Sequence, residues 1–263
     1  MIYDLQKASF WKRVSAFMLD AIIVIIAITG FALLISNVID IDSDYEAYSS
    51  LMTSYNQQYS QNEWGYAVDF NEEKFGDKEF SALTEEQQKY IHDAVAVITA
   101  DPEYQRCANM IFTKTVLIVT FSLLLSFLIC EFIIPLIFKN GQTIGKKIFS
   151  IAVMRVDGVK VTPVVMFVRS VLGKYTIEAM IPAYLLLMHH FNVGTYVTLA
   201  VLILIPLFQL ILLWKTKTNS CIHDVLSSTV VVDLQSQMIF DSLEAKQEYQ
   251  LRIHSEDVKR SGY

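Results

Sequence analysis

The sequence predicts an all-α membrane protein with about four transmembrane helices, a small cytoplasmic β element and a mainly helical extracytoplasmic insert. Three observations lead to this fold class. The 263 residues have a positive mean hydropathy of +0.39. Only 18% of them are charged, against about 25% in soluble domains. The apolar residues gather in runs of the length that crosses a bilayer, which is about 20 residues.

The first two candidate spans are long and apolar. Val14 to Ser36 is interrupted only by Asp20, and residues 116–138 contain Glu131. A signal peptide is the alternative for the first run, because lysines and an arginine precede it. Its length, its aspartate and the lack of a small-residue cleavage site favour a transmembrane helix instead.

The third and fourth candidate spans lie close together. The third runs from about Ile177 to Phe191 and is short, so an earlier start at Val164 is the alternative. The fourth runs from Thr195 to Trp214, and Asn192-Val193-Gly194 is expected to form the turn between them.

The distribution of charge predicts the orientation. Segment 139–176 holds seven basic residues and one acidic residue, whereas segment 37–115 holds 15 acidic and five basic residues. The positive-inside rule then places both termini and segment 139–176 in the cytoplasm. The expected location is therefore the cell membrane, with several spans and the acidic segment outside.

Four regions follow from this topology. They are residues 1–36 with the first span, the acidic insert 37–115, the multi-span region 116–234 and the polar tail 235–263, a solvated helix or disordered segment. In the insert, Thr84 is expected to be a helix N-cap, with Gln87 completing a capping box. The sequence is compatible with two structures for this insert, a small, mainly helical cap and a variable loop.

Two stretches near the membrane have the composition of strands. Phe149 to Val156 is expected to pair with Val159 to Thr162 across the turn Asp157-Gly158, a strong hairpin signal. Thr229 to Leu234 is a third β-rich run. Together these segments predict a small sheet under the membrane.

Two acidic residues fall inside apolar runs and are candidates for function. Asp20 follows Arg13 by seven residues, so the two share a helix face about 10 Å apart along the axis. Glu131 lies at a similar expected depth. A carboxylate at the bilayer centre costs about 2.5–3.5 kcal/mol. Asp20 is therefore either a ligand for an ion or substrate, or a packing contact to a cationic or hydroxyl group on a neighbouring helix. If Asp20 and Glu131 face each other, one of the two carboxylates would keep its proton more firmly and could exchange it near neutral pH.

Arg169, Lys174 and Glu178 cluster at the start of the third span. They could neutralise the two intramembrane acids. The alternative is that their side chains reach toward the interface and satisfy one another.

The sequence shows no sign of enzyme or cofactor chemistry. Gly141 to Lys147 has the glycines and lysines of a phosphate loop without its spacing, so the expectation is a turn with lysines near lipid headgroups. His223-Asp224 and His189-His190 have no third metal ligand at useful spacing. The three cysteines form no C-x-x-C pair. We expect no metal, no cofactor, no nucleic-acid partner and no enzyme activity.

Three segments together resemble the RDD family of bacterial membrane proteins. They are Phe10 to Asp20, Gly141 to Gly158 and His223 to Val232. The resemblance implies that Arg13, Asp20 and Asp224 are the arginine and two aspartates that name the family. It covers about residues 8–36 and 116–234 but not the insert, and it implies a transport function, with sodium/proton exchange in some members.

Two functions therefore fit the sequence. The first is a transporter or cation/proton exchanger, with Asp20 and Glu131 as acidic ligands, Arg13 setting the local field and Asp224 closing the cytoplasmic side. The second is a non-transporting membrane scaffold or envelope sensor, whose insert binds a partner or ligand. A four-helix chain is small for a transporter, so the first function implies a homo-oligomer in the lipid bilayer.

Overall fold

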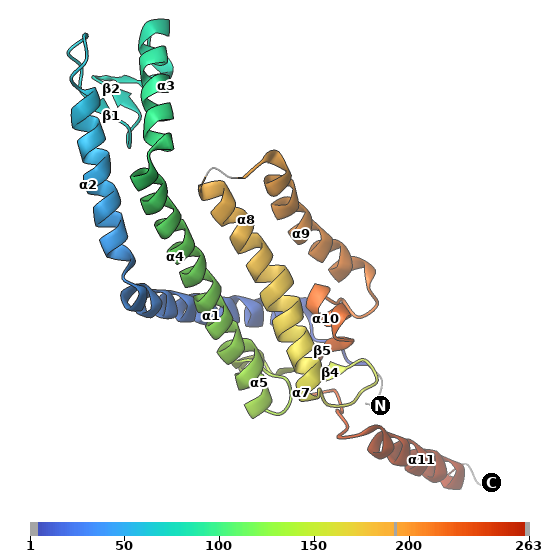
Figure 1. Cartoon of the computed structure of the whole chain (residues 1–263). Coiled ribbons are helices and arrows are strands. Elements are labelled where there is room, and N and C mark those ends of the chain that lie inside the picture. The colour runs from blue at the N-terminus through green and yellow to red at the C-terminus, as the bar shows by residue number, and fades with distance from the viewer. Residues whose placement is uncertain (1–4, 192–193, 261–263) are drawn as a thin grey trace. The chain divides into compact units, whose positions relative to one another are not determined.

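The computed structural model describes residues 5–191 and 194–260, and most of them are helical (Figure 1). The chain divides into two compact units. The first, here called the membrane unit, contains residues 1–32 and 119–263. The second, the insert unit, contains residues 33–118.

Among the described residues, four stretches of helix are long and apolar enough to cross a membrane, which confirms the predicted fold class. The first is α1 (Phe10–Ile39). The second, Pro102–Ile137, joins α4 (Pro102–Phe127), the π-helix η2 (Leu128–Ile133) and α5 (Ile134–Ile137). The third, Pro163–His190, joins α7 (Pro163–Phe167), the π-helix η3 (Val168–Met180) and α8 (Ile181–His190). The fourth is α9 (Tyr196–Lys215).

The third span begins far earlier than Ile177, so that predicted start is wrong and the earlier alternative is correct. The helix starts at Pro163, and proline is well suited to the first position because the backbone N–H there has no partner within the helix. The hydroxyl of Thr162 caps it by accepting a hydrogen bond from the Val165 N–H at 3.3 Å. Two of the three residues of the predicted turn Asn192-Val193-Gly194, Asn192 and Val193, lie outside the described residues.

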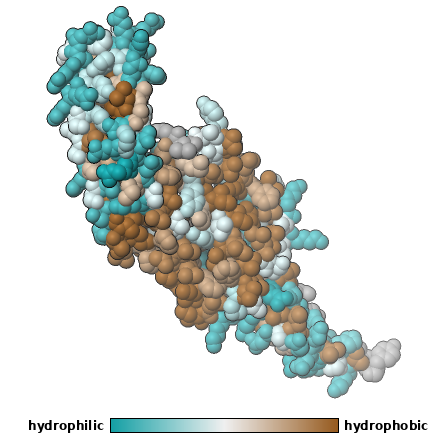
Figure 2. Space-filling model, in the orientation of Figure 1, coloured by the Kyte–Doolittle hydropathy of each residue, from teal (hydrophilic) through white to brown (hydrophobic). Residues whose placement is uncertain are grey.

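Aromatic side chains mark both ends of α9. Tyr196 at its start and Trp214 near its end are each 91% exposed. Such aromatic residues favour the two membrane–water interfaces. Their positions support the prediction that Thr195 to Trp214 is a membrane span. Figure 2 shows hydrophobic side chains gathered over α8 and α9.

Helix α1 contacts the rest of the membrane unit through its first half. Its buried residues are Ala16, Asp20 and Val24. In Figure 1 its ribbon runs across the direction of α8 and α9 rather than beside them. The later apolar side chains, such as Ile25 and Ile26, are exposed at 60% and 66% and are available to lipid.

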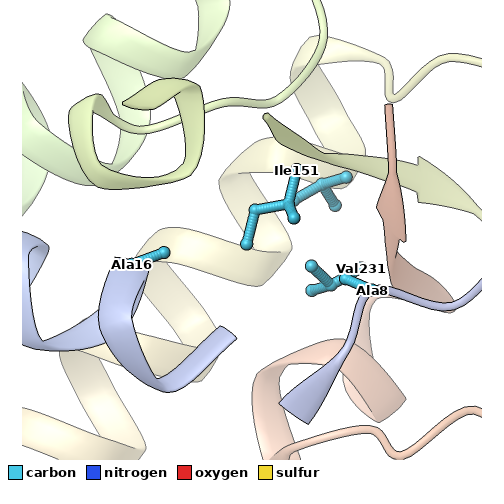
Figure 3. Close-up of a cluster of buried hydrophobic side chains, with 5 residues drawn as sticks. Ala8, Ala16, Ile151 and Val231 are labelled. Carbon is cyan, nitrogen blue, oxygen red and sulfur yellow. The ribbon is translucent and has the colours of Figure 1, made fainter. Parts of the chain in front are cut away.

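A two-stranded sheet joins distant parts of the membrane unit. β4 (Ile151–Arg155) pairs antiparallel with β5 (Thr229–Asp233), with Val153 opposite Val231. The N-terminal segment extends the sheet, because the Ala8 N–H donates to the Val231 carbonyl at 3.2 Å. The cluster of Ala8, Ala16, Ile151, Val153 and Val231 packs α1 onto this sheet (Figure 3).

The predicted hairpin is only partly correct. The turn at Asp157-Gly158 forms, with Gly158 at a φ of 89° and its N–H donating to the Arg155 carbonyl at 2.9 Å. The expected return strand, Val159 to Thr162, makes one isolated bridge to β4, from Lys160 to Met154, and a second to Phe240, from Val159. β5 is the main partner of β4 instead, because its valines cover the apolar residues of β4.

The insert unit folds as a mainly helical element rather than as a loop. It contains α2 (Ile41–Tyr59), three two-residue strands, a short 3₁₀ helix (Phe80–Ala82), α3 (Glu85–Ala100) and the first part of α4; the strands are β1 (Val68–Asp69), β2 (Lys74–Phe75) and β3 (Lys78–Glu79). The predicted capping box at Thr84 and Gln87 is present. Phe75, which is 1% exposed, packs edge-to-face against Trp64 and Tyr66.

The described part of the chain contains three further helices. They are α6 (Ile144–Ile148), α10 (Ile222–Leu226) and α11 (Leu243–Arg260). Of the two alternatives for the polar tail, the structure has the helix, α11.

Candidate functional site

A network of charged side chains lies in the membrane unit, and its members are buried or, for Arg13, Lys174 and Glu178, partly buried. We define the charge network as Asp20, Glu131, Glu178, Asp224, Arg13, Lys146, Arg169, Lys174 and His223. With a neutral histidine its four acids and four bases have a formal sum of zero. Burying unpaired charge is costly, so this balance is what allows so many ionic groups inside an apolar unit.

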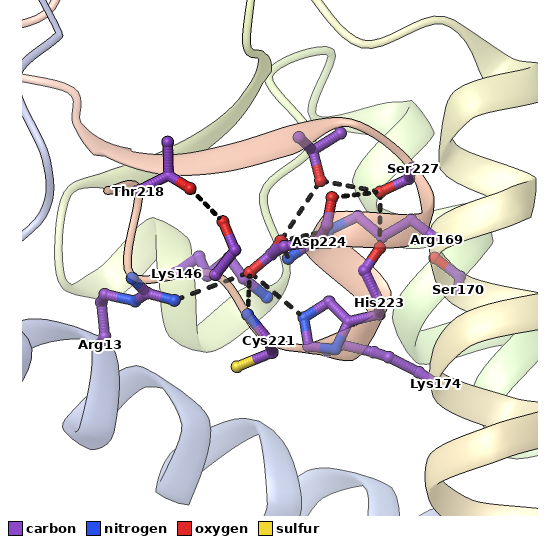
Figure 4. A network of polar contacts seen from close by, with 12 residues as sticks. Arg13, Lys146, Arg169, Ser170, Lys174, Thr218, Cys221, His223, Asp224 and Ser227 are labelled. Carbon is purple, nitrogen blue, oxygen red and sulfur yellow. Dashed lines mark hydrogen bonds and ion pairs between the residues drawn. The ribbon is translucent and has the colours of Figure 1, made fainter. Parts of the chain in front are cut away.

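Asp224 on α10 is held by two arginines (Figure 4). Arg169 donates to its Oδ1 from Nε at 3.1 Å and from Nη2 at 2.6 Å, and both side chains are 1% exposed. Arg13 Nη2 lies 3.6 Å from its Oδ2. Burial opposes the charged form, but Arg169, His223 and Arg13 together hold the pKa of Asp224 well below its ordinary value.

His223 connects α10 to the third span. Its Nδ1 lies 2.8 Å and 3.0 Å from the two carboxylate oxygens of Glu178, and its backbone N–H donates to the same carboxylate at 3.2 Å. Gly173 makes this approach possible, because a Cβ there would lie 2.6 Å from the His223 Cβ. Burial lowers the pKa of His223, although Asp224 and Glu178 oppose that shift.

Glu131 and Lys174 form an ion pair between the second and third spans. Lys174 Nζ lies 2.6 Å from Glu131 Oε2, and Glu131 is 4% exposed. Ser170 links the same two helices by donating to the Glu131 carbonyl at 2.5 Å. The pair therefore places a carboxylate and an ammonium inside the apolar part of the molecule.

Asp20 anchors α1 to the residues at the start of α6. One carboxylate oxygen accepts the Thr143 hydroxyl, and the other accepts the Gly145 N–H at 2.7 Å. Lys146 Nζ lies 3.6 Å away. These contacts match the interpretation of Asp20 as a packing contact to hydroxyl and cationic groups.

The two lysines after the second span have different environments, so the expectation that both lie near lipid headgroups is wrong for Lys146. Lys147 is exposed and lies 3.8 Å above the Phe138 ring. Lys146 is 7% exposed. Burial, Lys174 and Arg169 together lower the pKa of Lys146 to about 8, against the opposing effect of Glu131 and Asp20.

The charges of the second and third spans lie in π-helical turns. Glu131 belongs to η2, and Arg169, Lys174 and Glu178 belong to η3. In an α-helix, residues five apart such as Arg169 and Lys174 would lie roughly 140° apart around the axis. Hydrogen bonding from i to i+5 brings them toward one face, and π-helical turns are rare and frequent at functional sites. Hydropathy and spacing rules based on α-helices gave no signal for this geometry.

The predicted charge partners are distributed differently from the expectation. Lys174 neutralises Glu131, but Arg169 pairs with Asp224 and Glu178 pairs with His223. The sequence suggests Asp20 and Glu131 as a possible facing pair of carboxylates. Each has its own partners instead: Asp20 contacts Thr143, Gly145 and Lys146, and Glu131 contacts Lys174.

Among the described residues, one group of possible metal ligands combines Cys221 with two members of the charge network. Donor atoms of Cys221, His223 and Asp224 are all within 4.8 Å of one another, so the expectation that no third ligand approaches the His-Asp pair is wrong. However, burial raises the pKa of the Cys221 thiol to about 11, and two arginines already pair with Asp224. A thiol that keeps its proton is a poor ligand for a cation, and so is a carboxylate whose charge is already paired with two arginines.

The comparison with protein families decides the identity of the chain. The model of the RDD family matches residues 7–228, which is most of the sequence. The chain belongs to the RDD family. No curated protein and no solved structure matches it. Arg13, Asp20 and Asp224 are the residues that the resemblance assigns to the arginine and two aspartates of the family name. In this RDD protein Arg13 and Asp224 form an ion pair. Asp20 lies in a separate set of hydrogen bonds.

Proposed function

We propose that this RDD protein is a transporter of the cell membrane that exchanges a monovalent cation for protons, with Glu131 as the acid that receives the cation. The observation that supports this most is the buried Glu131–Lys174 ion pair between two candidate spans. Ionisable residues inside membrane segments are costly and commonly mark ion paths. The proposal assigns no covalent chemistry to the protein.

The charge balance favours exchange over one-way uptake. The four acids and four bases of the charge network cancel when His223 is neutral. A cation that enters this buried region adds a positive charge that no acid is left to neutralise. Release of one proton from a base restores the balance, so coupling one cation to one proton avoids an uncompensated buried charge.

The other predicted site residues have supporting roles in this proposal. Asp20 anchors α1 to the N-terminal end of α6, because its two oxygens accept hydrogen bonds from the Thr143 hydroxyl and the Gly145 N–H. Asp224 connects α10 to the first span through its ion pair with Arg13, and to the third span through its ion pair with Arg169. In the proposed topology both termini are cytoplasmic and the insert unit is outside, and the transporter is a homo-oligomer.

Flux in proteoliposomes tests the proposal. Vesicles that enclose a pH-sensitive dye are prepared with the wild-type protein, Glu131→Gln or Asp20→Asn. Sodium, potassium or lithium is then added to the outside solution. Glu248→Gln is the matched control, because Glu248 is exposed on α11. A cation-dependent pH change that is lost in Glu131→Gln and kept in Glu248→Gln supports exchange. Equal flux in wild type and in well-inserted Glu131→Gln would contradict the role of Glu131.

A scaffold or envelope sensor is the second candidate function. The observation that favours it is that residues 33–118 form a compact unit with its own aromatic core. Under this hypothesis, deletion of residues 37–106 abolishes the cellular phenotype while the membrane unit still folds. Absence of flux in verified, correctly inserted wild type would favour this second function.

A further inference from the structure

Lys146 is surrounded by charges from three other elements. Asp20 on α1 lies 3.6 Å from its ammonium. Glu131 on η2 and Lys174 and Arg169 on η3 also act on it electrostatically. Two acids therefore favour its charged form, and two bases together with burial oppose it.

Lys146 is the base in this group whose proton is held least firmly. Arg169 cannot lose its proton in a protein. Lys174 Nζ forms a close ion pair with the Glu131 carboxylate, at 2.6 Å. The nearest carboxylate of Lys146 is 1.0 Å farther away than that, at 3.6 Å, and its other contact is the neutral Thr143 hydroxyl at 3.1 Å.

We propose that Lys146 is the residue that releases the exchanged proton when a monovalent cation reaches Glu131, and that takes one up when the cation leaves. This inference rests on the exchange function proposed above. The N–H bond of the ammonium breaks, its electron pair stays on Nζ, and the proton passes to water. The incoming cation replaces the lost positive charge, so the formal charge of the network does not change.

The titration range of Lys146 agrees with this role. Its pKa of about 8 lies close to physiological pH, so both protonation states are accessible at small cost. An ordinary exposed lysine, with a pKa near 10.4, would hold its proton throughout this range.

Lys146→Arg is the decisive variant, because arginine keeps the positive charge but cannot release a proton. Lys147→Arg is the matched control on the same helix, since Lys147 is exposed. In proteoliposomes we expect cation-driven pH change to be lost in Lys146→Arg and unchanged in Lys147→Arg. Exchange that is intact in Lys146→Arg would overturn the role of Lys146 and leave the exchange function standing, whereas no exchange in wild type would remove both.

A second measurement does not depend on how the variant folds. NMR of wild-type protein with isotope-labelled lysine side chains, in lipid nanodiscs, follows each Nζ as the pH rises. We expect one lysine to titrate near pH 8, and sodium to shift that midpoint downward because the cation and the proton compete. If every lysine titrates near the ordinary value of about 10.4, the proposal is wrong.

Discussion

Asp224 accepts two hydrogen bonds from Arg169, at 3.1 Å from Nε and 2.6 Å from Nη2, and neither side chain is more than 1% exposed. The pair joins α10, which follows the last span, to the π-helix of the third span. It is the most deeply buried ion pair described in the charge network.

Asp224→Asn should destabilise the membrane unit strongly. Removal of one partner from a buried ion pair leaves an uncompensated charge and costs about 3–5 kcal/mol. Thermal unfolding in detergent, followed by circular dichroism, measures the loss. Asp233→Asn is the control, since its partner Lys12 is 36% exposed and such pairs contribute about 0–1 kcal/mol. Equal losses in the two variants would contradict the structural role of the Arg169–Asp224 pair.

Gly145→Ala should prevent correct docking of α1. A Cβ at residue 145 would lie 2.4 Å from the Ala16 carbonyl oxygen and 2.8 Å from Asp20 Oδ1. Both atoms belong to the packed first half of α1, so the helix would have to move. Gly30→Ala is the control, because nothing lies within 4 Å of its added Cβ and alanine favours a helix by about 1 kcal/mol. The yield of monodisperse protein and its thermal midpoint distinguish the two; a normal Gly145→Ala protein would refute the close packing.

Stability should fall as the pH drops below about 6.5, the ordinary pKa of histidine. Burial lowers the pKa of His223, so below that value the unfolded chain binds a proton that the folded protein does not. Protons therefore favour the unfolded state in this window. Thermal midpoints between about pH 5 and pH 8 measure the slope, since the window is set by the histidine pKa.

His223→Gln should reduce this slope, whereas His92→Gln should leave it unchanged because the His92 side chain is 85% exposed. A slope that survives in His223→Gln would show that another group is responsible.

Impermeant thiol labelling should reveal the proposed topology. In a background with Cys107, Cys130 and Cys221 replaced by alanine, Ser81→Cys should react in intact cells, because the acidic insert is expected outside. Ser255→Cys should react only after the cells are permeabilised. Both serines are exposed, so accessibility within the protein does not limit either reaction. The reverse pattern would invert the proposed orientation.

Several features could be predicted because they depend on local sequence. Hydropathy identified the four candidate spans, although not the early start of the third, since about 20 apolar residues in succession are sufficient to identify a transmembrane segment. The capping box at Thr84 was predicted because the N-cap and its partner are only three residues apart. The β-rich composition of Thr229 to Leu234 also identified a real strand, Thr229–Asp233.

The tertiary structure alone decided which charged residues meet. Arg13 and Asp224 come from opposite ends of the sequence, and Asp20 reaches the backbone of Gly145. Lys146 and Lys147 are adjacent and chemically identical, yet one is buried and the other exposed. Apolar runs determine where helices cross a membrane, but the pairing of charges depends on the faces that the packed helices present to one another, and here π-helical turns changed those faces.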